Sequence, residues 1–202
     1  VGWFGFNGGS ALSAGGDAAM AILATHISAA AGAMTWMFYE WIKFGKPTAL
    51  GSVTGMVAGL GTITPASGFV GPAGALVIGI IAGYVCFNAV IIIKQKFKID
   101  DSLDVFPVHG VGGICGTILV GFFASKELGI FSGQGGWSHE AIIISDQLQI
   151  QFTAVVATAA YTAIATFIIL KLVDLVTGLR VDSQTETQGL DLESHGEKGY
   201  DL

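Results

Sequence analysis

Charged residues are scarce in this sequence. Asp, Glu, Lys and Arg make up only 12% of its 202 residues, whereas 52% are hydrophobic. A water-soluble domain of this length could hardly cover its surface with so few polar side chains. Lysine and arginine together number nine and form no basic cluster, so nothing indicates a nucleic-acid partner. The scarcity of charge therefore predicts a polytopic membrane protein surrounded by a lipid bilayer.

Cysteine is also rare, and no catalytic constellation is visible. Cys86 and Cys115 each lie inside an apolar run, where cysteine more often packs as a small side chain than forms a disulfide or binds a metal. We expect neither a metal nor a cofactor. No nucleophile, base and orienting partner occur together, which argues against an enzyme. Because the chain begins with Val1 in an apolar run, we expect it to be a fragment that lacks an N-terminal part.

Long apolar runs are abundant, and a helix needs roughly 20 such residues to cross a bilayer. Residues 1–14 are shorter and are predicted to be the end of a transmembrane helix. Residues 15–124 are predicted to hold four transmembrane helices, at 18–44, 48–63, 69–93 and 104–124. The remaining predicted segments are an extracellular loop at 125–147 with Trp137 and His139, a long last helix at 148–178 and a cytoplasmic tail at 179–202.

The cationic residues of the loops predict the orientation, because they are enriched on the cytoplasmic side of membrane proteins. With these spans, one side of the membrane carries seven lysines and arginines, at positions 43, 46, 94, 96, 98, 180 and 198. The other side carries only Lys126. The predicted topology therefore places the C-terminal tail in the cytoplasm, and Ser10 and Thr64 on the outer side.

One titratable side chain lies deep inside an apolar run. Asp100, Asp101 and Asp104 precede the predicted helix at 104–124, and His109 follows about two turns into the apolar stretch. An ionisable group at such a depth is costly unless something satisfies it, and it marks a functional site by default. The alternative is a core histidine that hydrogen-bonds to a helix backbone. The three carboxylates are predicted to cap and polarise the helix N-terminus, where negative groups are favourable.

Short motifs with a recognisable order run along the whole chain. They are Gly2-Trp3-Phe4-Gly5-Phe6-Asn7, Gly9-Ser10, Gly45-Lys46-Pro47, Thr64-Pro65-Ala66, Asp100-Asp101, Asp104-Val105-Phe106, Val108-His109-Gly110, Gly178-Leu179-Arg180-Val181, Gly189-Leu190-Asp191 and Ser194-His195-Gly196-Glu197. With these motifs the chain resembles the ammonium transporter family, the Amt/Mep/Rh group, and within it the Amt branch.

The resemblance implies an all-α ammonium-transporter fold of eleven transmembrane helices. In that fold two five-helix halves form an inverted repeat around a narrow pore, and a long eleventh helix straps the outside. This chain would hold the second half of the repeat and the long last helix. The other pore histidine of the family would lie in the first half, which has no counterpart here. The resemblance also implies a homotrimer with one pore in each subunit.

The resemblance further implies roles for five residues. His109 matches the second of two pore histidines, whose rings can share a proton. Phe6 matches a phenylalanine that closes the outer mouth, and Trp3 lies one turn earlier on the same face; aromatic faces attract ammonium. Ser10 matches a hydroxyl that accepts an N–H of ammonium, and Thr64 would shape the same vestibule. Taken alone, the aromatic pair is more typical of an interfacial belt, Ser10 of a helix cap and Thr64 of a turn.

A second intramembrane histidine matches none of the motifs. His26 falls inside the predicted helix at 18–44, and Thr25 and Ser28 beside it offer local hydrogen-bond partners. We predict that His26 is dispensable for conduction.

The tail has two readings. Residues 181–202 include six acidic residues and almost no apolar ones, which by composition predicts disorder. The resemblance implies instead that the tail docks against the transporter and meets a PII-type signalling protein. The residues that match the regulatory motifs are Asp191, His195, Gly196 and Glu197.

These expectations predict a cell-membrane channel or transporter for ammonium or ammonia. Ammonium would be recruited outside near Trp3, Phe6 and Ser10, lose its hydration shell and its proton, and cross an apolar pore past His109. Selectivity against potassium would come from hydrogen bonding and deprotonation, which a metal ion cannot provide. The alternative is an ammonium sensor that signals through its cytoplasmic tail, and a third hypothesis is a membrane scaffold without transport.

Overall fold

The computed structural model describes residues 1–131 and 143–199, and within these ranges the chain is helical and has no β-sheet. The predicted loop residues Trp137 and His139 lie outside the described residues. The α-helices are α1 (Gly2–Gly9), α2 (Gly16–Phe44), α3 (Ala49–Ile63), α4 (Pro72–Val90), α5 (Val111–Phe123), α6 (Ile144–Val176), α7 (Ser183–Gln188) and α8 (Leu190–His195). Two π-helical segments, η1 (Ile91–Lys96) and η2 (Phe106–Gly110), extend α4 and precede α5, and a 3₁₀-helix, η3 (Lys126–Phe131), follows α5.

The helix lengths make this an all-α polytopic membrane protein. Four helical stretches in the described residues are long and apolar enough to cross a bilayer: Gly16–Phe44, Pro72–Lys96, Phe106–Phe123 and Ile144–Val176. Ala49–Ile63 is apolar but shorter. The last helix begins at Ile144, four residues before the predicted start at 148. Asp146 suits this additional turn, because a carboxylate is favourable at a helix N-terminus.

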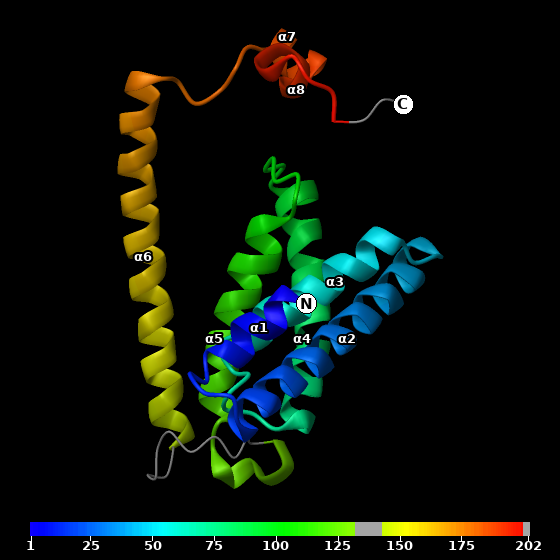
Figure 1. The fold of residues 1–202 in the computed structure, drawn as a ribbon, viewed down its shortest axis with the longest axis vertical. Coiled ribbons are helices and arrows are strands. Elements are labelled where there is room, and N and C mark those ends of the chain that lie inside the picture. The colour runs from blue at the N-terminus through cyan, green and yellow to red at the C-terminus, as the bar shows by residue number, and fades with distance from the viewer. Residues whose placement is uncertain (132–142, 200–202) are drawn as a thin grey trace. The chain divides into compact units, whose positions relative to one another are not determined.

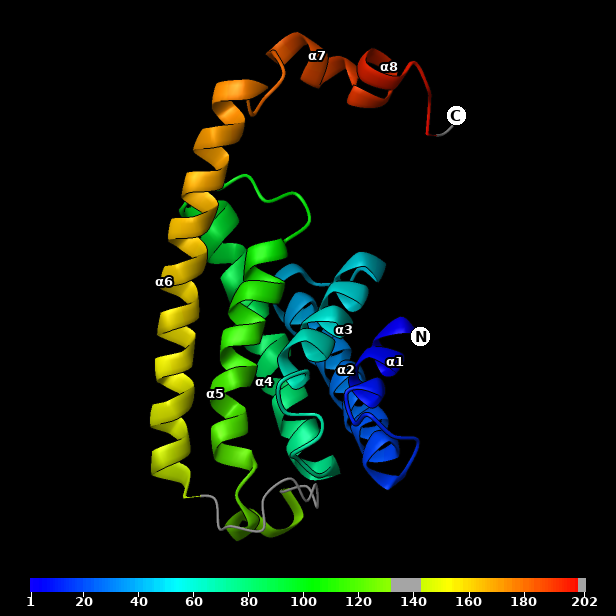
Figure 2. The same cartoon turned by 60° about the vertical axis from the view of Figure 1, so that its left-hand side comes forward.

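The chain divides into two units, and the first, Val1–Val155, is a bundle built around α2. In it α2 packs against both α3 and α4, these two contact each other and α5, and the short α1 lies on α2 (Figures 1 and 2). Successive helices from α2 to α5 run in alternating directions. The short connection from α2 to α3 starts at Gly45, whose φ of 79° favours glycine, and ends at Thr48, whose side chain accepts the Gly51 N–H.

Small residues bring α2 and α3 close together. A Cβ on Gly55 would overlap the Cβ of Trp36, and a Cβ on Gly59 would overlap the Ser28 carbonyl. The Ser28 hydroxyl donates to the Gly59 carbonyl at 2.9 Å. Close approach and interhelical hydrogen bonds matter here because lipid gives apolar burial little force to drive helix association.

Buried apolar side chains form two clusters in this unit. One contains Ile63, Val70, Ile78 and Phe123. The other contains Trp36, Phe87 and Val108, with the Trp36 and Phe87 rings edge to face at 5.3 Å between centroids. Because Val108 precedes His109 in the chain, the second cluster anchors the segment that carries this histidine.

The second unit, Val156–Leu202, contains the remainder of α6 and the two short helices of the tail. Asp182 caps α7 by accepting the N–H groups of Gln184 and Thr185. Arg180 pairs with Glu186 at 2.6 Å, and Gly189 and Gly196 end the two helices with positive φ. The disorder predicted from composition is therefore replaced by local helices, because caps satisfy backbone groups that short helices leave free.

Candidate functional site: residues around His109

Thr64 ends α3 and holds the indole of Trp3, which comes from α1. The Trp3 Nε1–H donates to Thr64 Oγ1 at 2.8 Å, across 61 positions of sequence. The Thr64 hydroxyl in turn donates to the Leu60 carbonyl at 2.8 Å. The hydroxyl is thereby oriented with its lone pairs toward the indole, and the half-buried ring of Trp3 is held in a fixed direction.

The imidazole of His109 lies against the same indole. The two rings are stacked, with 6.2 Å between centroids and 9° between planes. His109 itself is exposed within this chain, whereas Val108 before it is buried. The structure thus brings together three of the five predicted pore residues, from α1, from the end of α3 and from η2.

Phe6 and Ser10 lie further along α1 and at its end. The Phe6 side chain is 65% exposed. Ser10 is the C-cap residue of α1, and its hydroxyl donates to the Phe6 carbonyl at 2.9 Å. Ser10 therefore has the cap geometry that the sequence left open, while its exposed oxygen keeps lone pairs that can accept another donor.

His109 lies in a π-helical segment, which the apolar pattern of the sequence does not predict. The segment Phe106–Gly110 is wound more loosely than an α-helix, and the Val111 N–H bonds to the Phe106 carbonyl, five residues back. Pro107, at the start of the segment, has no N–H to donate. Short π-helical segments are rare and occur frequently at functional sites. Pro107, two residues before the histidine, is the sequence signal that could have indicated irregular winding.

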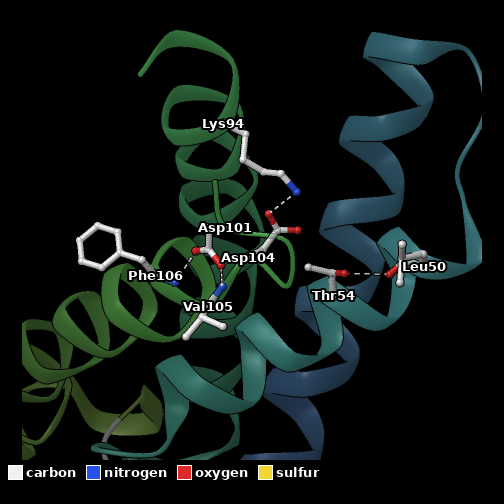
Figure 3. A network of polar contacts seen from close by, with 7 residues as sticks. All are labelled: Leu50, Thr54, Lys94, Asp101, Asp104, Val105 and Phe106. Atoms are coloured by element: carbon white, nitrogen blue, oxygen red, sulfur yellow. Dashed lines mark hydrogen bonds and ion pairs between the residues drawn. The ribbon is translucent and has the colours of Figure 1, made fainter. Parts of the chain in front are cut away.

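Two carboxylates hold the N-terminal end of this segment (Figure 3). The Asp101 carboxylate accepts the N–H groups of Val105 at 2.9 Å and Phe106 at 2.8 Å, which confirms the predicted cap for this residue. Asp104 acts differently from the prediction: its carboxylate pairs with Lys94 of η1 at 3.0 Å. The backbone of Asp104 has a φ of 55°, which turns its side chain away from a capping position and toward the lysine.

A buried polar pair between α1 and α2 was also missed. Asn7 Nδ2 donates to Thr25 Oγ1 at 2.8 Å, and the Thr25 hydroxyl donates to the Ala21 carbonyl at 2.6 Å. Thr25 and Ser28 were the expected partners of His26. Thr25 bonds instead to Asn7 and Ala21, and Ser28 bonds to Gly59. The exposed ring of His26 lies beside Phe4 instead, with 5.7 Å between centroids.

In the tail, the predicted regulatory residues gather around the end of α8. The Asp191 carboxylate accepts the Gly199 N–H at 3.4 Å, and its carbonyl accepts the Glu197 N–H at 3.0 Å. Gly196 follows His195, the last residue of α8, with a φ of 65°. This conformation explains a glycine at position 196, and all four predicted residues are exposed in the unit.

Comparison with known proteins places the chain in a family. The sequence model described as the Ammonium Transporter Family matches residues 1–200. The chain belongs to this family. It is 46% identical to an ammonium transporter of Bacillus subtilis over 98% of this chain and 48% of that protein. It is 47% identical to ammonium transporter Amt1 of Archaeoglobus fulgidus over 98% of this chain and 49% of that protein. The chain thus spans about half the length of the curated relatives it matches.

Solved structures of the ammonium transporter family share the fold. A structure titled Sensor Amt Protein superposes with a TM-score of 0.83 at 31% identity, covering 95% of this chain and 45% of that one. The crystal structure of Saccharomyces cerevisiae Mep2 superposes with a TM-score of 0.76 at 36% identity, covering 91% and 41%. The helical bundle described above therefore corresponds to part of an Amt/Mep transporter.

Proposed function

We propose that the protein is a multi-pass cell-membrane transporter or channel for ammonium or ammonia. The observation that carries the proposal is the stack of Trp3 on His109, with the indole N–H held by Thr64, in a chain of the ammonium transporter family. An aromatic face next to an imidazole suits a small cation that can donate hydrogen bonds and release a proton.

Each group has a distinct task in the proposed path. The ring faces of Trp3 and Phe6 attract ammonium at the outer mouth, by about 0.5–2 kcal/mol depending on how far the cation is desolvated. The exposed oxygen of Ser10 accepts one of its N–H groups. After the hydration shell is lost and a proton is released to water at the outer mouth, ammonia passes His109, whose ring nitrogens offer one donor and one acceptor when the imidazole is neutral. A potassium ion can neither donate these hydrogen bonds nor be deprotonated.

The test is uptake by the protein made from its complete gene, in a host that lacks its own ammonium transporters. His109→Ala is expected to abolish ammonium uptake or its selectivity over potassium. His26→Ala is the matched control, since His26 is also an exposed histidine of a membrane-spanning helix and is expected to leave uptake unchanged. Unchanged, ammonium-selective uptake by His109→Ala would contradict the proposed role.

The proposal includes the assembly and its orientation. We infer a homotrimer with the tail in the cytoplasm, on the strength of the family and of the cationic loops. The turn formed by Asp191, His195, Gly196 and Glu197 is the proposed contact for a PII-type regulatory protein. If Asp191→Ala and Gly196→Asp both left transport and its regulation unchanged, this regulatory role would be wrong.

A sensor is the second candidate function. It is favoured by the similarity to the structure titled Sensor Amt Protein and by the ordered helices of the tail. The discriminating experiment deletes the tail from Val181 onward. Ammonium flux that persists while the cellular response to ammonium is lost supports the sensor.

A further inference from the structure

The short helix α1 is fastened at two points on one face. Trp3 and Asn7 are four residues apart, a spacing that puts their side chains on the same side of a helix. Trp3 bonds to Thr64 at the end of α3, and Asn7 bonds to Thr25 in α2. The two bonds together set how this face of α1 is turned toward α2 and α3.

The Asn7 fastening is the more buried of the two. Asn7 is 3% exposed and Thr25 is fully buried, whereas Trp3 and Thr64 are half-buried. The Thr25 hydroxyl uses its hydrogen for the Ala21 carbonyl and its lone pairs for the Asn7 amide. Loss of this hydroxyl would leave a buried amide without its acceptor, which is costly. The chain next approaches α2 at Gly8, where a Cβ would lie only 2.8 Å from Ile22 Cγ1.

We propose that Thr25 is a positioning residue for ammonium conduction. α1 packs on α2, and the Trp3–Thr64 bond holds it at one position on α3. The Asn7–Thr25 bond supplies a second point and thereby fixes the rotation of α1 about its axis. That rotation sets the angle of the Trp3 indole, which lies within 9° of the His109 plane. The inference rests on the proposed function, because the role of Thr25 is expressed through the ring face that ammonium meets.

The test measures ammonium uptake at a series of concentrations by the protein from its complete gene. Thr25→Val keeps the shape but removes the hydroxyl, and it is expected to raise the half-saturating ammonium concentration roughly 3- to 10-fold, the factor that loss of one hydrogen bond corresponds to. Thr25→Ser restores the hydroxyl and is expected to stay within about twofold of the wild type, the low end of what such a bond contributes. A defect in folding alone would lower the maximal rate and leave the half-saturating concentration unchanged.

Ser28→Ala is the matched control. Ser28 is a fully buried hydroxyl of the same helix, but it bonds to Gly59 of α3 and not to α1. It is expected to leave the half-saturating concentration unchanged. If Thr25→Val does not reach the membrane, Asn7→Leu removes the same bond from the other side and carries the same expectation.

A double-mutant cycle tests whether Thr25 acts through Trp3. Trp3→Leu removes the ring through which Thr25 is proposed to act, so adding Thr25→Val to it is expected to change uptake less than in the wild type. Equal effects of Thr25→Val in both backgrounds would overturn the inference. A Thr25→Val protein with the half-saturating ammonium concentration of the wild type would also overturn it. The His109→Ala variant tests the proposed function separately. A wild-type protein without ammonium uptake would overturn both.

Discussion

The indole of Trp3 lies parallel to the imidazole of His109, at 6.2 Å between ring centroids. One ring comes from a helix of eight residues near the beginning of the chain, and the other from a π-helical segment near its middle. The helix α2 contacts α3 and α4. Since α1 packs on α2 and η2 packs on α3 and α4, the two rings meet at this bundle. The bundle therefore determines the geometry of the stack, and changes to either ring test its role.

Replacing the aromatic ring should weaken capture of ammonium. Trp3→Leu removes both the ring face and the N–H group, and we expect the half-saturating ammonium concentration to rise by roughly 2- to 30-fold, which corresponds to the strength of a cation–π contact. Trp3→Phe keeps a ring and should change it less. Trp41→Leu is the control, because Trp41 is an exposed aromatic residue near the C-terminal end of α2. Equal half-saturation by Trp3→Leu and the wild type would show that the ring does not meet the substrate.

Removing the cap of the His109 segment should destabilise the protein. Asp101→Ala deletes the acceptor of two backbone N–H groups, and we expect a loss of about 1 kcal/mol in the free energy of unfolding. Asp101→Asn keeps a side-chain oxygen and should cost less. Thermal unfolding of the purified protein in detergent measures both changes. The prediction is wrong if Asn and Ala destabilise equally.

The Lys94–Asp104 pair allows charge and backbone conformation to be separated. Asp104→Asn removes the charge but tolerates a φ of 55°, and it should cost about 0.2–1 kcal/mol, as expected for a partly exposed ion pair. Asp104→Val also loses the pair and adds a β-branched side chain in a left-handed conformation, which should cost about 1–2 kcal/mol more. Unfolding curves of the two variants test the difference. Similar midpoints for Asn and Val would rule out a contribution from the backbone conformation.

Much of the fold could be predicted from local signals. Pro47 and the Thr64-Pro65 turn mark the two ends of the apolar run that forms α3. The neighbouring apolar runs are long enough to span a membrane. The Asp101 cap was predictable for the same reason, since its partners are only four and five residues away. Each of these features depends on neighbours in the sequence.

The contacts at the site could not be predicted in this way. The Trp3–Thr64 bond joins residues 61 positions apart, and the Asn7–Thr25 bond joins residues 18 apart on different helices. Their partners depend on how α1 rotates against the bundle, which an apolar pattern does not specify. Thr25 looked like a neighbour for His26, because sequence proximity does not tell which face of a helix a hydroxyl occupies.

The tail offers a pH-dependent prediction. Hydrogen bonds from the backbone and hydroxyl of Thr185 lower the pKa of Asp182 below its usual value of 3.8. Because the pKa is lowered by folding, the cap stabilises α7 fully above the usual value and is lost as the pH falls through the lowered pKa. We therefore expect the helical ¹³Cα chemical shifts of residues 183–188 to persist at neutral pH and to disappear in strong acid.

Glu186 also carries a carboxylate in this helix and pairs with Arg180, so the titration is done in a Glu186→Gln protein. In that protein Asp182→Ala should reduce the helical shifts at neutral pH and remove their acid transition, and a transition that survives Asp182→Ala would assign the pH dependence to another group.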